Sequence, residues 1–503
     1  MTGVAVVGAG PVGLTLAGRL AQHGVEVALF DAAPGHVGEG SKALCMQRET
    51  LEIWDRLGIG ERVAERGIQW HVGRTYFRER ELFSITLPAT TDDHFPPFVN
   101  ISQTEVEAML LARLAELGVT VQWGRRVVGV EQDGEGVTLA FEDGSHQRAA
   151  YAVGTDGAHS GVRHAIGLSF DGYSFDDRFL ITDVRARLPF PRERRFFFDP
   201  PWNPGRQMLI HPQPDDGWRI DWQVPAETDP DAEVASGRLD ARIRAVIGPD
   251  VPYELVWMTA YRFSQRLADR FRVGRVFLAG DAAHVFSPFG ARGLNSGAAD
   301  AENLAWKLAA VLRGEGSDAL LDSYDAERRT AARENLAVTE ATMRFMVPHG
   351  PLRRAWREVI LRLSEHVAWA RRRVNSGRLA QPATYAASRF VGEPAADPRL
   401  PRPGSVLVDV RLSDGRRLRE LTGRGFVALV PRGAAPALPG VTVLTDPALA
   451  RPYAPAPESE SDPEPEPEPR AWLIRPDAHI AATGRPEELP VMLARALGRA
   501  RVA

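Results

Sequence analysis

Near its N-terminus the chain carries the glycine spacing G-x-G-x-x-G, in a stretch that holds Gly8, Gly10, Pro11, Val12 and Gly13. In this pattern the first glycine permits a tight turn, the second lets a pyrophosphate approach the backbone, and the third lets a helix and a strand pack closely. An apolar run at residues 4–7 precedes the glycines, and an amphipathic run at residues 14–23 follows them. This order predicts a buried strand, a turn and a helix whose first amide groups face a phosphate.

A second apolar run, at residues 25–30, ends on Asp31, which lies 23 positions after Gly8. At about this distance an acidic side chain accepts hydrogen bonds from a ribose hydroxyl. A glycine-rich turn alone is weak evidence, but strand, glycines, helix, strand and acid in this order are specific. The sequence therefore predicts a dinucleotide-binding unit at the N-terminus.

Two later stretches place an aspartate directly after a predicted strand. The run at residues 148–153 leads into Asp156, within a Gly-Thr-Asp-Gly stretch, and the buried run at residues 273–279 ends at Gly280 and Asp281. After Asp281 comes a loop that precedes a long helical pattern and contains the glycines Gly290, Gly293 and Gly297.

The residues between these motifs predict the elements that must position them. Residues 41–67 have a helical pattern, and residues 70–87 alternate as two strands around a charged turn, which favours a hairpin in a second sheet. A helix is expected at residues 105–117, where Ser102 and Glu105 have the spacing of a capping box. Three strands are expected next, at residues 119–123, 126–132 and 136–142.

The pattern is all strand from residue 178 to residue 225, with alternating residues between Pro, Gly and Asp turns. This part is rich in aromatic side chains, namely Phe196, Phe197, Phe198, Trp202, Trp218 and Trp222. Aromatic alternation usually marks a sheet face packed on a core. As a group, however, these side chains could also wall the pocket of an aromatic substrate.

Helical patterns at residues 322–346 and 353–376 lead to a proline-rich linker at residues 398–403. Beyond the linker, strands are expected at residues 405–410, 426–430, 441–444 and 472–475, with a closing helix at residues 487–497. This order suggests a small thioredoxin-like α/β module. The chain has one cysteine, Cys45, so this module lacks a C-x-x-C motif and disulfide redox chemistry is excluded there.

Composition excludes several classes of protein. The net charge is −4, and removing the six acids of residues 458–469 leaves +2, so the folded body lacks the basic excess of a nucleic-acid-binding protein. No apolar run approaches the roughly 20 residues that span a bilayer, and the opening run lacks the basic flank of a signal peptide. A single cysteine permits neither an internal disulfide nor a cysteine metal cluster. We expect a cytoplasmic protein that binds neither nucleic acid nor membrane.

The three glycine and aspartate stretches together resemble the single-component flavoprotein aromatic hydroxylases, the class of para-hydroxybenzoate hydroxylase, phenol hydroxylase and the aromatic-polyketide hydroxylases. Members bind FAD through the N-terminal glycines and carry a mid-chain motif similar to residues 154–163. Their third motif reads here Gly280-Asp281-Ala282-Ala283-His284, then Pro288 and Gly293-Leu294-Asn295. The resemblance covers residues 1–345, and the tail without cysteines is similar to that of phenol and polyketide hydroxylases.

The resemblance implies a role for each matching residue. Asp281 would hydrogen-bond the ribityl chain, and Pro288 with the backbone of residues 293–295 would line the isoalloxazine. Asp156, with Arg163, would support both FAD and NAD(P)H. The implied cofactor-binding residues are Gly8, Gly10, Pro11, Val12, Gly13, Asp31, Lys42, Gln103, Asp156, Gly280, Asp281, Pro288, Gly293, Leu294 and Asn295. Among these, Lys42 stands where the family more often has arginine.

The implied fold is α/β, with a Rossmann-like FAD-binding domain interleaved with a β-sheet substrate domain and followed by a small thioredoxin-like α/β domain. The FAD-binding domain is expected to comprise residues 1–70, 99–177 and 264–345. The other expected parts are a substrate-binding β-sheet domain (71–98 and 178–263), a helical linker (346–396) and a thioredoxin-like C-terminal domain (397–503).

The implied activity is that of an NAD(P)H-dependent FAD monooxygenase with a role in antibiotic biosynthesis. NADH or NADPH reduces FAD, dioxygen adds at flavin carbon 4a, and a phenolic or polycyclic, polyketide-like aromatic substrate attacks the distal oxygen of the hydroperoxide. The protein must exclude water and help to deprotonate a phenol. Strand placement gives four candidates for the base: His71, Tyr76, His211 and Asp221. A monomer or homodimer is expected.

Other functions remain alternatives. A Baeyer-Villiger or epoxidising monooxygenase could use the same scaffold, and a non-catalytic FAD binder would share its motifs. A flavin-dependent halogenase is disfavoured because Trp218 and Trp222 are four positions apart rather than two, as its Gly-Trp-x-Trp-x-Ile-Pro motif requires. A plain NAD-dependent dehydrogenase does not explain the second and third motifs.

Overall fold

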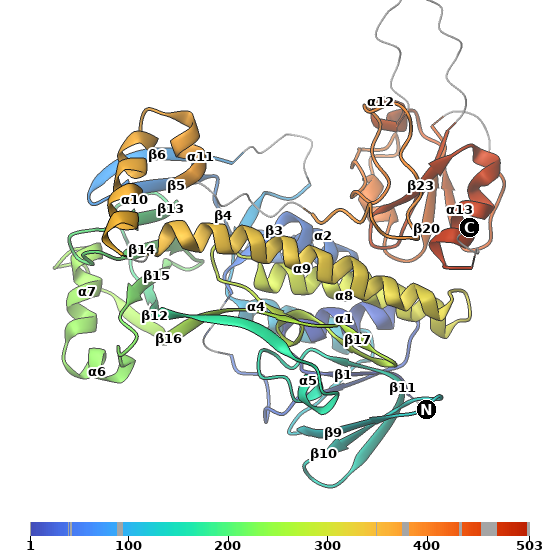
Figure 1. Ribbon diagram of the computed structural model, residues 1–503, viewed down its shortest axis with the longest axis horizontal. Coiled ribbons are helices and arrows are strands. Elements are labelled where there is room, and N and C mark those ends of the chain that lie inside the picture. The colour runs from blue at the N-terminus through green and yellow to red at the C-terminus, as the bar shows by residue number, and fades with distance from the viewer. Residues whose placement is uncertain are drawn as a thin grey trace, which may run out of the picture.

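The computed structural model describes residues 2–38, 40, 43–87, 94–348, 350–374, 382–431, 435–453 and 470–499. These residues form two eight-stranded sheets, a three-stranded sheet and a four-stranded C-terminal sheet, surrounded by helices (Figure 1). Lys42 and the acidic stretch at residues 458–469 lie outside the described residues. The mixed α/β fold expected from the sequence is confirmed.

The first sheet has the N-terminal strand at its centre, in the order β17-β18-β11-β1-β2-β8, and β10 and β9 extend from β11. Strands β18, β11, β1, β2 and β8 run parallel. Its strands are β1 (Thr2–Val7), β2 (Val27–Phe30), β8 (Val121–Gln122), β9 (Val127–Gln132), β10 (Val137–Phe141), β11 (His146–Gly154), β17 (Arg272–Val273) and β18 (Val276–Leu278). Helix α1 (Pro11–Gln22) follows β1 and packs on α8 (Gly293–Leu312), as the strand–glycine–helix pattern predicted.

The second sheet has the order β19-β16-β12-β15-β14-β13-β5-β6. Its strands are β5 (Val72–Phe77), β6 (Arg80–Thr86), β12 (Phe170–Arg185), β13 (Arg194–Phe198), β14 (Gln207–Pro212), β15 (Gly217–Val224), β16 (Glu254–Ala268) and β19 (His284–Val285). The predicted hairpin at residues 70–87 is β5–β6, and it joins this second sheet as expected. Two short helices, α6 (Pro230–Ala235) and α7 (Arg238–Ile247), connect β15 to β16.

The predicted single helical pattern at residues 41–67 is wrong. In its place the described residues form β3 (Cys45–Gln47), α2 (Arg48–Leu57) and α3 (Gly60–Arg66). Strand β3 pairs with β7 (Phe98–Asn100), which also pairs with β4 (Ile68–Gln69). Pairing with a strand more than 50 residues away therefore overrides the local helical periodicity.

Two further local predictions need correction. The run at residues 273–279 is not one strand, because Gly274, at φ +59°, turns the chain between β17 and β18. Ser102 does precede α4 (Gln103–Glu116), but it does not close a capping box. Its hydroxyl instead contacts the Thr104 hydroxyl at 2.7 Å. Glu105 pairs with Arg66 at 2.9 Å.

Helix α9 (Asp318–Met346) runs across the molecule and joins its two ends (Figure 1). At one end, α10 (Pro351–Ser364) and α11 (Ala368–Val374) lie over the β5–β6 hairpin. A further short helix, α5 (Gly161–Ala165), follows the second aspartate motif. None of the described helices is long and apolar enough to cross a membrane.

The C-terminal sheet lies near the other end of α9 and has the order β21-β20-β22-β23. Its strands are β20 (Phe426–Leu429), β21 (Val441–Leu444), β22 (Ala471–Ile474) and β23 (Ile480–Gly484), with helices α12 (Ala450–Tyr453) and α13 (Leu489–Ala496). The strand expected at residues 405–410 is wrong, since this segment makes only an isolated bridge from Val406 to His479. The sequence did not predict β23. The thioredoxin-like character of this part stays a prediction.

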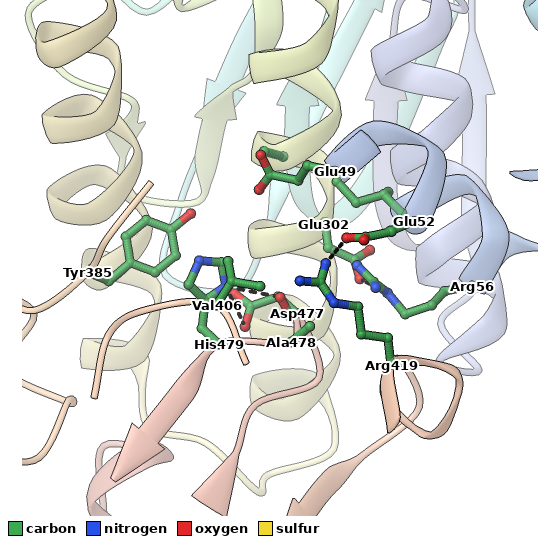
Figure 2. Close-up of a pocket in the computed structure, with 12 residues that line it drawn as sticks. Glu49, Glu52, Arg56, Glu302, Tyr385, Val406, Arg419, Asp477, Ala478 and His479 are labelled. Atoms are coloured by element: carbon green, nitrogen blue, oxygen red, sulfur yellow. Dashed lines mark hydrogen bonds and ion pairs between the residues drawn. The ribbon is translucent and has the colours of Figure 1, made fainter. Parts of the chain in front are cut away.

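Buried ionic contacts join the C-terminal sheet to α8 and α9. The Glu327 carboxylate accepts hydrogen bonds from Lys307 Nζ (2.8 Å), both terminal nitrogens of Arg475 (3.0 Å each) and Ser388 Oγ (2.7 Å). Although burial alone raises its pKa, Arg475 and Lys307 hold the pKa of Glu327 well below its ordinary value. Close by, Figure 2 shows side chains of the C-terminal part, Arg419 among them, facing acids of α2 and α8 across a pocket of only about 20 Å³.

Candidate functional site

The glycine turn after β1 shows which of its glycines the fold itself requires. Gly8 has φ +108°, and a Cβ there would lie 2.5 Å from the carbonyl oxygen of Thr155. A Cβ on Gly13 would lie 1.9 Å from the carbonyl oxygen of Gly8. At Gly10, by contrast, a Cβ would meet no protein atom within 4 Å. Packing therefore requires Gly8 and Gly13, whereas the open side of Gly10 leaves space for a ligand against the backbone.

Asp31 lies at the end of β2, beside this turn. Its carboxylate accepts hydrogen bonds from the backbone N–H groups of Ala9 (2.6 Å) and Ala33 (2.8 Å). These bonds fix the carboxylate next to the glycine turn and leave acceptor positions on both oxygens. The predicted bond from Asp31 to a ribose hydroxyl stays a prediction.

The third motif is anchored from behind by buried charges. The Gly280 N–H donates to Asp300 Oδ2 (3.0 Å), which also contacts His284 Nε2 (2.6 Å), while Arg328 Nε donates to Asp300 Oδ1 (2.7 Å). Burial alone raises the pKa of Asp300, but His284 and Arg328 hold it below its ordinary value. This network fixes the turn so that the neighbouring Asp281 side chain lines the cavity described below.

The second motif ties α5 to the third motif. The Asp156 carboxylate accepts hydrogen bonds from Ser160 Oγ (2.5 Å) and the Val162 N–H (3.1 Å), and burial raises its pKa. Arg163 Nη1 donates to the carbonyl oxygen of Ala282 at 2.9 Å. In the structure Asp156 and Arg163 thus hold backbone segments together, and their predicted roles toward FAD and NAD(P)H stay predictions.

Helix α8 begins at the cavity and is fixed there by Asn295. Its Oδ1 accepts hydrogen bonds from the Gln47 N–H (2.9 Å) and Thr50 Oγ1 (2.7 Å), and its Nδ2 donates to the Cys45 carbonyl oxygen (2.9 Å). Gln47 Nε2 in turn donates to the Gly290 carbonyl oxygen at 3.1 Å. The first amide groups of a helix have no partners within it and carry partial positive charge. This end of α8 can therefore support negative charge on a bound ring.

A cavity of about 530 Å³ connects the glycine turn to the second sheet. Nine of the predicted cofactor residues line it: Gly10, Pro11, Val12, Gln103, Asp281, Pro288, Gly293, Leu294 and Asn295. The predicted cofactor residues that the structure describes but that do not line the cavity are Gly8, Gly13, Asp31, Asp156 and Gly280. Lys42 is outside the described residues, so its predicted contact stays untested.

The lining fits FAD in its chemistry and its order. The open backbone at Gly10 and the N-terminus of α1 suit a pyrophosphate, and the N-terminus of α8 suits the flavin ring. Gln103 lines the same cavity, and there its Oε1 accepts a hydrogen bond from the Ala43 N–H (3.3 Å) and its Nε2 donates to Glu107 (2.9 Å). FAD, if bound there, would extend from Asp31 to Asn295.

The opposite wall of the cavity is one face of the second sheet. Strand alternation sends Phe196 and Phe198 into the cavity lining, whereas Phe197 points to the other face and stacks on Tyr76, with ring centroids 4.5 Å apart. Trp202, Trp218 and Trp222 belong with Phe197 to the core on that other face. The aromatic residues therefore divide between the cavity and a core, and the sequence did not show which would line the pocket.

Two of the four base candidates line the cavity, His211 and Asp221, whereas His71 and Tyr76 do not. Burial raises the pKa of Asp221 to about 7, and its Oδ1 is buried without a hydrogen-bond partner. Burial, with the nearby cations Arg194 and Arg219, lowers the pKa of His211 well below its ordinary value, so this imidazole is neutral at neutral pH. Asp221 is therefore a lining group that changes charge near neutral pH.

The sequence did not predict the two arginines, Arg194 and Arg219, that lie on this wall of the cavity. Arg219 forms a bidentate pair with Asp183, with Nε–Oδ1 at 2.8 Å and Nη2–Oδ2 at 2.7 Å. Arg194 also lines the cavity. The spacing of Arg194, Phe196 and Phe198 at every second position of one strand was the signal that could have placed all three on one face.

Part of the cavity lining is apolar. Phe289, Met346 of α9 and Val374 of α11 line it and belong to one hydrophobic core with Phe196 and Phe198. Thr342, one turn before Met346, is also part of the lining. Helices α9 and α11 thus bring apolar side chains to the cavity, and apolar lining disfavours water there.

Comparison with known proteins agrees with these features. The family described as FAD binding domain matches residues 1–339. The 3-(3-hydroxy-phenyl)propionate/3-hydroxycinnamic acid hydroxylase of Mycobacterium sp. (strain KMS) is 32% identical over 438 residues, which cover 85% of this chain and 75% of that protein. The rifampicin monooxygenase of Streptomyces venezuelae is 35% identical over 350 residues, 69% of this chain and 72% of that one.

Solved structures show the same fold. The rebeccamycin biosynthetic enzyme RebC with reduced flavin has a TM-score of 0.76 and 25% identity, and the match covers 99% of both chains. The p-nitrophenol 4-monooxygenase PnpA of Pseudomonas putida DLL-E4 has a TM-score of 0.65 and 29% identity over 74% of this chain and 96% of that one. With the three motifs gathered around one cavity, the chain belongs to the FAD-binding-domain family of monooxygenases, as a single-component FAD-dependent aromatic hydroxylase.

Proposed function

We propose that this enzyme uses NAD(P)H and dioxygen to hydroxylate a phenolic or polycyclic aromatic compound in the cavity between α8 and the second sheet. The observation that carries the proposal is the continuity of this cavity, which runs from the glycine turn past the N-terminus of α8 to a wall with Phe196 and Phe198. A flavin bound at α8 would face an aromatic substrate across it. When bound and reduced by NAD(P)H, FAD supplies the activation of dioxygen.

The residues of the chain have separate tasks in this proposal. Gly10 and α1 bind the pyrophosphate, and Asp281 and the amide groups at the start of α8 orient the flavin end. The buried network around Asp300 holds Gly280 in place, and the apolar part of the lining around Met346 excludes water. Exclusion of water favours transfer of oxygen to the substrate over release of hydrogen peroxide.

Asp221 is the proposed proton acceptor for the phenol. A general base works best when its pKa lies near the working pH, and burial raises the pKa of Asp221 to about 7. Its Oδ1 has no hydrogen-bond partner in the described protein, so it is available to a phenolic O–H. Removing that proton makes the ring more electron-rich and therefore a better nucleophile.

A substrate screen tests the function. Purified holoenzyme is offered NADH or NADPH and a series of phenols, and stimulated nicotinamide oxidation is followed together with product mass under labelled dioxygen. We expect one labelled oxygen atom in the product as a new hydroxyl group. Absence of both stimulation and oxygen gain with every phenol would refute the hydroxylase. A labelled lactone or epoxide would instead support the Baeyer-Villiger or epoxidising alternative, and bound FAD without any turnover the non-catalytic one.

A further inference from the structure

Arg194 is a cation on the cavity wall whose charge no carboxylate balances. Its guanidinium lies 5.3 Å from the centroid of the Phe196 ring, and no acid of the described chain pairs with it. The thiol of Cys45 lies near enough to offset this charge as a thiolate, but it is protonated at neutral pH because burial raises its pKa to about 12. Arginine keeps its charge in proteins, so the wall carries a fixed positive charge at this point.

The sheet register shows why the neighbouring acids do not reach Arg194. Arg194 lies beside Gly73 of β5, and His211 of β14 lies beside Arg219 of β15, which in turn lies beside Asp183 of β12. Asp183 is engaged by the bidentate pair with Arg219 and by Gln213 Nε2 at 2.6 Å. This row of side chains thus holds two arginines and one carboxylate, which is already committed.

The chain also leaves space at the guanidinium. Gly73, the cross-strand neighbour of Arg194, has no side chain, and a Cβ there would lie 4.0 Å from Arg194 Nη1 and 3.7 Å from Trp70. Gly73, Trp70 and Arg194 all line the cavity. An anion can therefore approach the guanidinium from the cavity without displacing a protein side chain.

Burying the unpaired guanidinium of Arg194 beside apolar side chains costs free energy of desolvation, and a bound anion would offset that cost. A planar carboxylate matches the fork of N–H donors on a guanidinium and forms two parallel hydrogen bonds with it. The next row of the same face holds Phe196, Leu209 and Asp221, which are cross-strand neighbours. An aromatic ring attached to the carboxylate would lie against this row, with a phenolic group within the reach of Asp221.

We propose that the substrate is an aromatic carboxylate, whose carboxylate binds Arg194 while its ring lies between the Phe196–Leu209 row and the N-terminus of α8. This inference rests on the proposed function and specifies its substrate class. Arg194 is assigned to substrate binding and orientation, and Asp221 to the phenolic proton. Neutral phenols of the same size would enter the cavity but lack the contact that fixes their orientation.

The test compares three probes of similar shape on the holoenzyme: 3-(3-hydroxyphenyl)propionate, its amide and 3-propylphenol. Binding is measured by the change in flavin absorbance on titration, and turnover by stimulated NAD(P)H oxidation. We expect the acid to bind at least tenfold more tightly than the amide or the alkylphenol, since hydrogen bonds to charged groups contribute about tenfold to a hundredfold in affinity. Arg194→Met should remove this preference by weakening only the acid, and Arg194→Lys should retain part of it.

Arg195→Met is the matched control, because Arg195 is the next residue of β13 and its guanidinium lies over Phe190, 4.2 Å from the ring centroid, outside the cavity lining. It should leave the affinities for all three probes unchanged. Thermal unfolding checks folding, and Arg194→Met should be as stable as the parent because it breaks no ion pair.

Equal binding of acid and amide by the parent enzyme would overturn the proposal, and so would equal losses for all probes in Arg194→Met or no binding of the acid. These outcomes are distinct from failure of the hydroxylase function, in which the acid binds through Arg194 but no phenol stimulates nicotinamide oxidation.

Discussion

Two glycines of the N-terminal turn should respond in opposite ways to the same substitution. Gly10→Ala should leave the fold intact and weaken FAD binding, whereas Gly13→Ala should destabilise the fold itself. The difference follows from what a Cβ would meet, since at Gly10 no protein atom lies within 4 Å, and at Gly13 the Gly8 carbonyl oxygen lies 1.9 Å away.

Gly10 has φ −73° and ψ −179°, which alanine adopts freely. Loss of chain entropy in the unfolded state stabilises Gly10→Ala by about 0.4–1 kcal/mol, and alanine is a poorer N-cap by a similar amount, so the net change is about zero. The new methyl group would occupy ligand space, and an overpacking cost of about 1–3 kcal/mol corresponds to roughly tenfold to a hundredfold weaker FAD binding.

For Gly13→Ala the same clash falls within the protein. The Cβ would also lie 2.6 Å from Thr155 Oγ1, which donates a hydrogen bond to the Gly8 carbonyl oxygen at 2.8 Å. We expect a loss of about 1–3 kcal/mol in the free energy of unfolding, because the helix-propensity gain of up to about 1 kcal/mol does not offset the displaced backbone.

The assay is urea unfolding of the apoprotein together with fluorescence titration of FAD, carried out on both variants and the parent. If Gly10→Ala bound FAD as tightly as the parent, the pyrophosphate would not lie against this turn. If Gly13→Ala unfolded at the parent's urea concentration, the packing argument would be refuted.

Three further predictions concern buried ionisable groups. Because burial raises the pKa of Asp221 to about 7, its carboxylate forms as the pH rises through that value, so kcat/KM should rise there. Asp221→Asn should abolish this limb of the pH profile and slow turnover roughly a hundredfold or more, and an unchanged profile would exclude Asp221 as the base. Glu327→Gln leaves Lys307 and Arg475 buried without their shared carboxylate, so the free energy of unfolding in urea should fall by about 3–5 kcal/mol. A fall below about 1 kcal/mol, which is typical of exposed ion pairs, would contradict this. Since burial raises the pKa of Cys45 to about 12, the thiol should react with a disulfide reagent far more slowly at pH 8 in the native protein than after unfolding, and equal rates would show a thiolate.

The N-terminal unit could be predicted because its signals are local. Strand, turn and helix follow one another within residues 2–22, and packing within the protein gives Gly8 and Gly13 a steric reason to be glycine. The structure also brings Asp281 and Asn295 of the third motif to one cavity, and their predicted contacts to FAD stay predictions. The buried partners that hold these groups, such as Asp300 and Arg328, come from helices whose packing the sequence does not state.

Elements that depend on distant pairing were harder to predict. Strand β3 exists because Cys45–Gln47 pairs with Phe98–Asn100, and β23 because it pairs with β22. The segment at residues 405–410 has strand-like composition, but only Val406 finds a bridge partner. The polar wall of the cavity has the same cause, since the position of Arg194 relative to Arg219 and Asp183 follows from a register that no local pattern encodes.

The ionic contacts around Glu327 have a thermodynamic consequence for the C-terminal sheet. They place Lys307 of α8, Glu327 of α9 and Arg475, the residue after β22, in one buried cluster. Separating the sheet from the helices would therefore leave these charged side chains without their partners. Unfolding of the two parts is then coupled, and a ligand that binds only the native state protects both. At a free FAD concentration 100 times its Kd, that protection is about 2.7 kcal/mol. A cofactor held at the glycine turn would thereby slow proteolysis of a sheet that contributes no residue to its cavity.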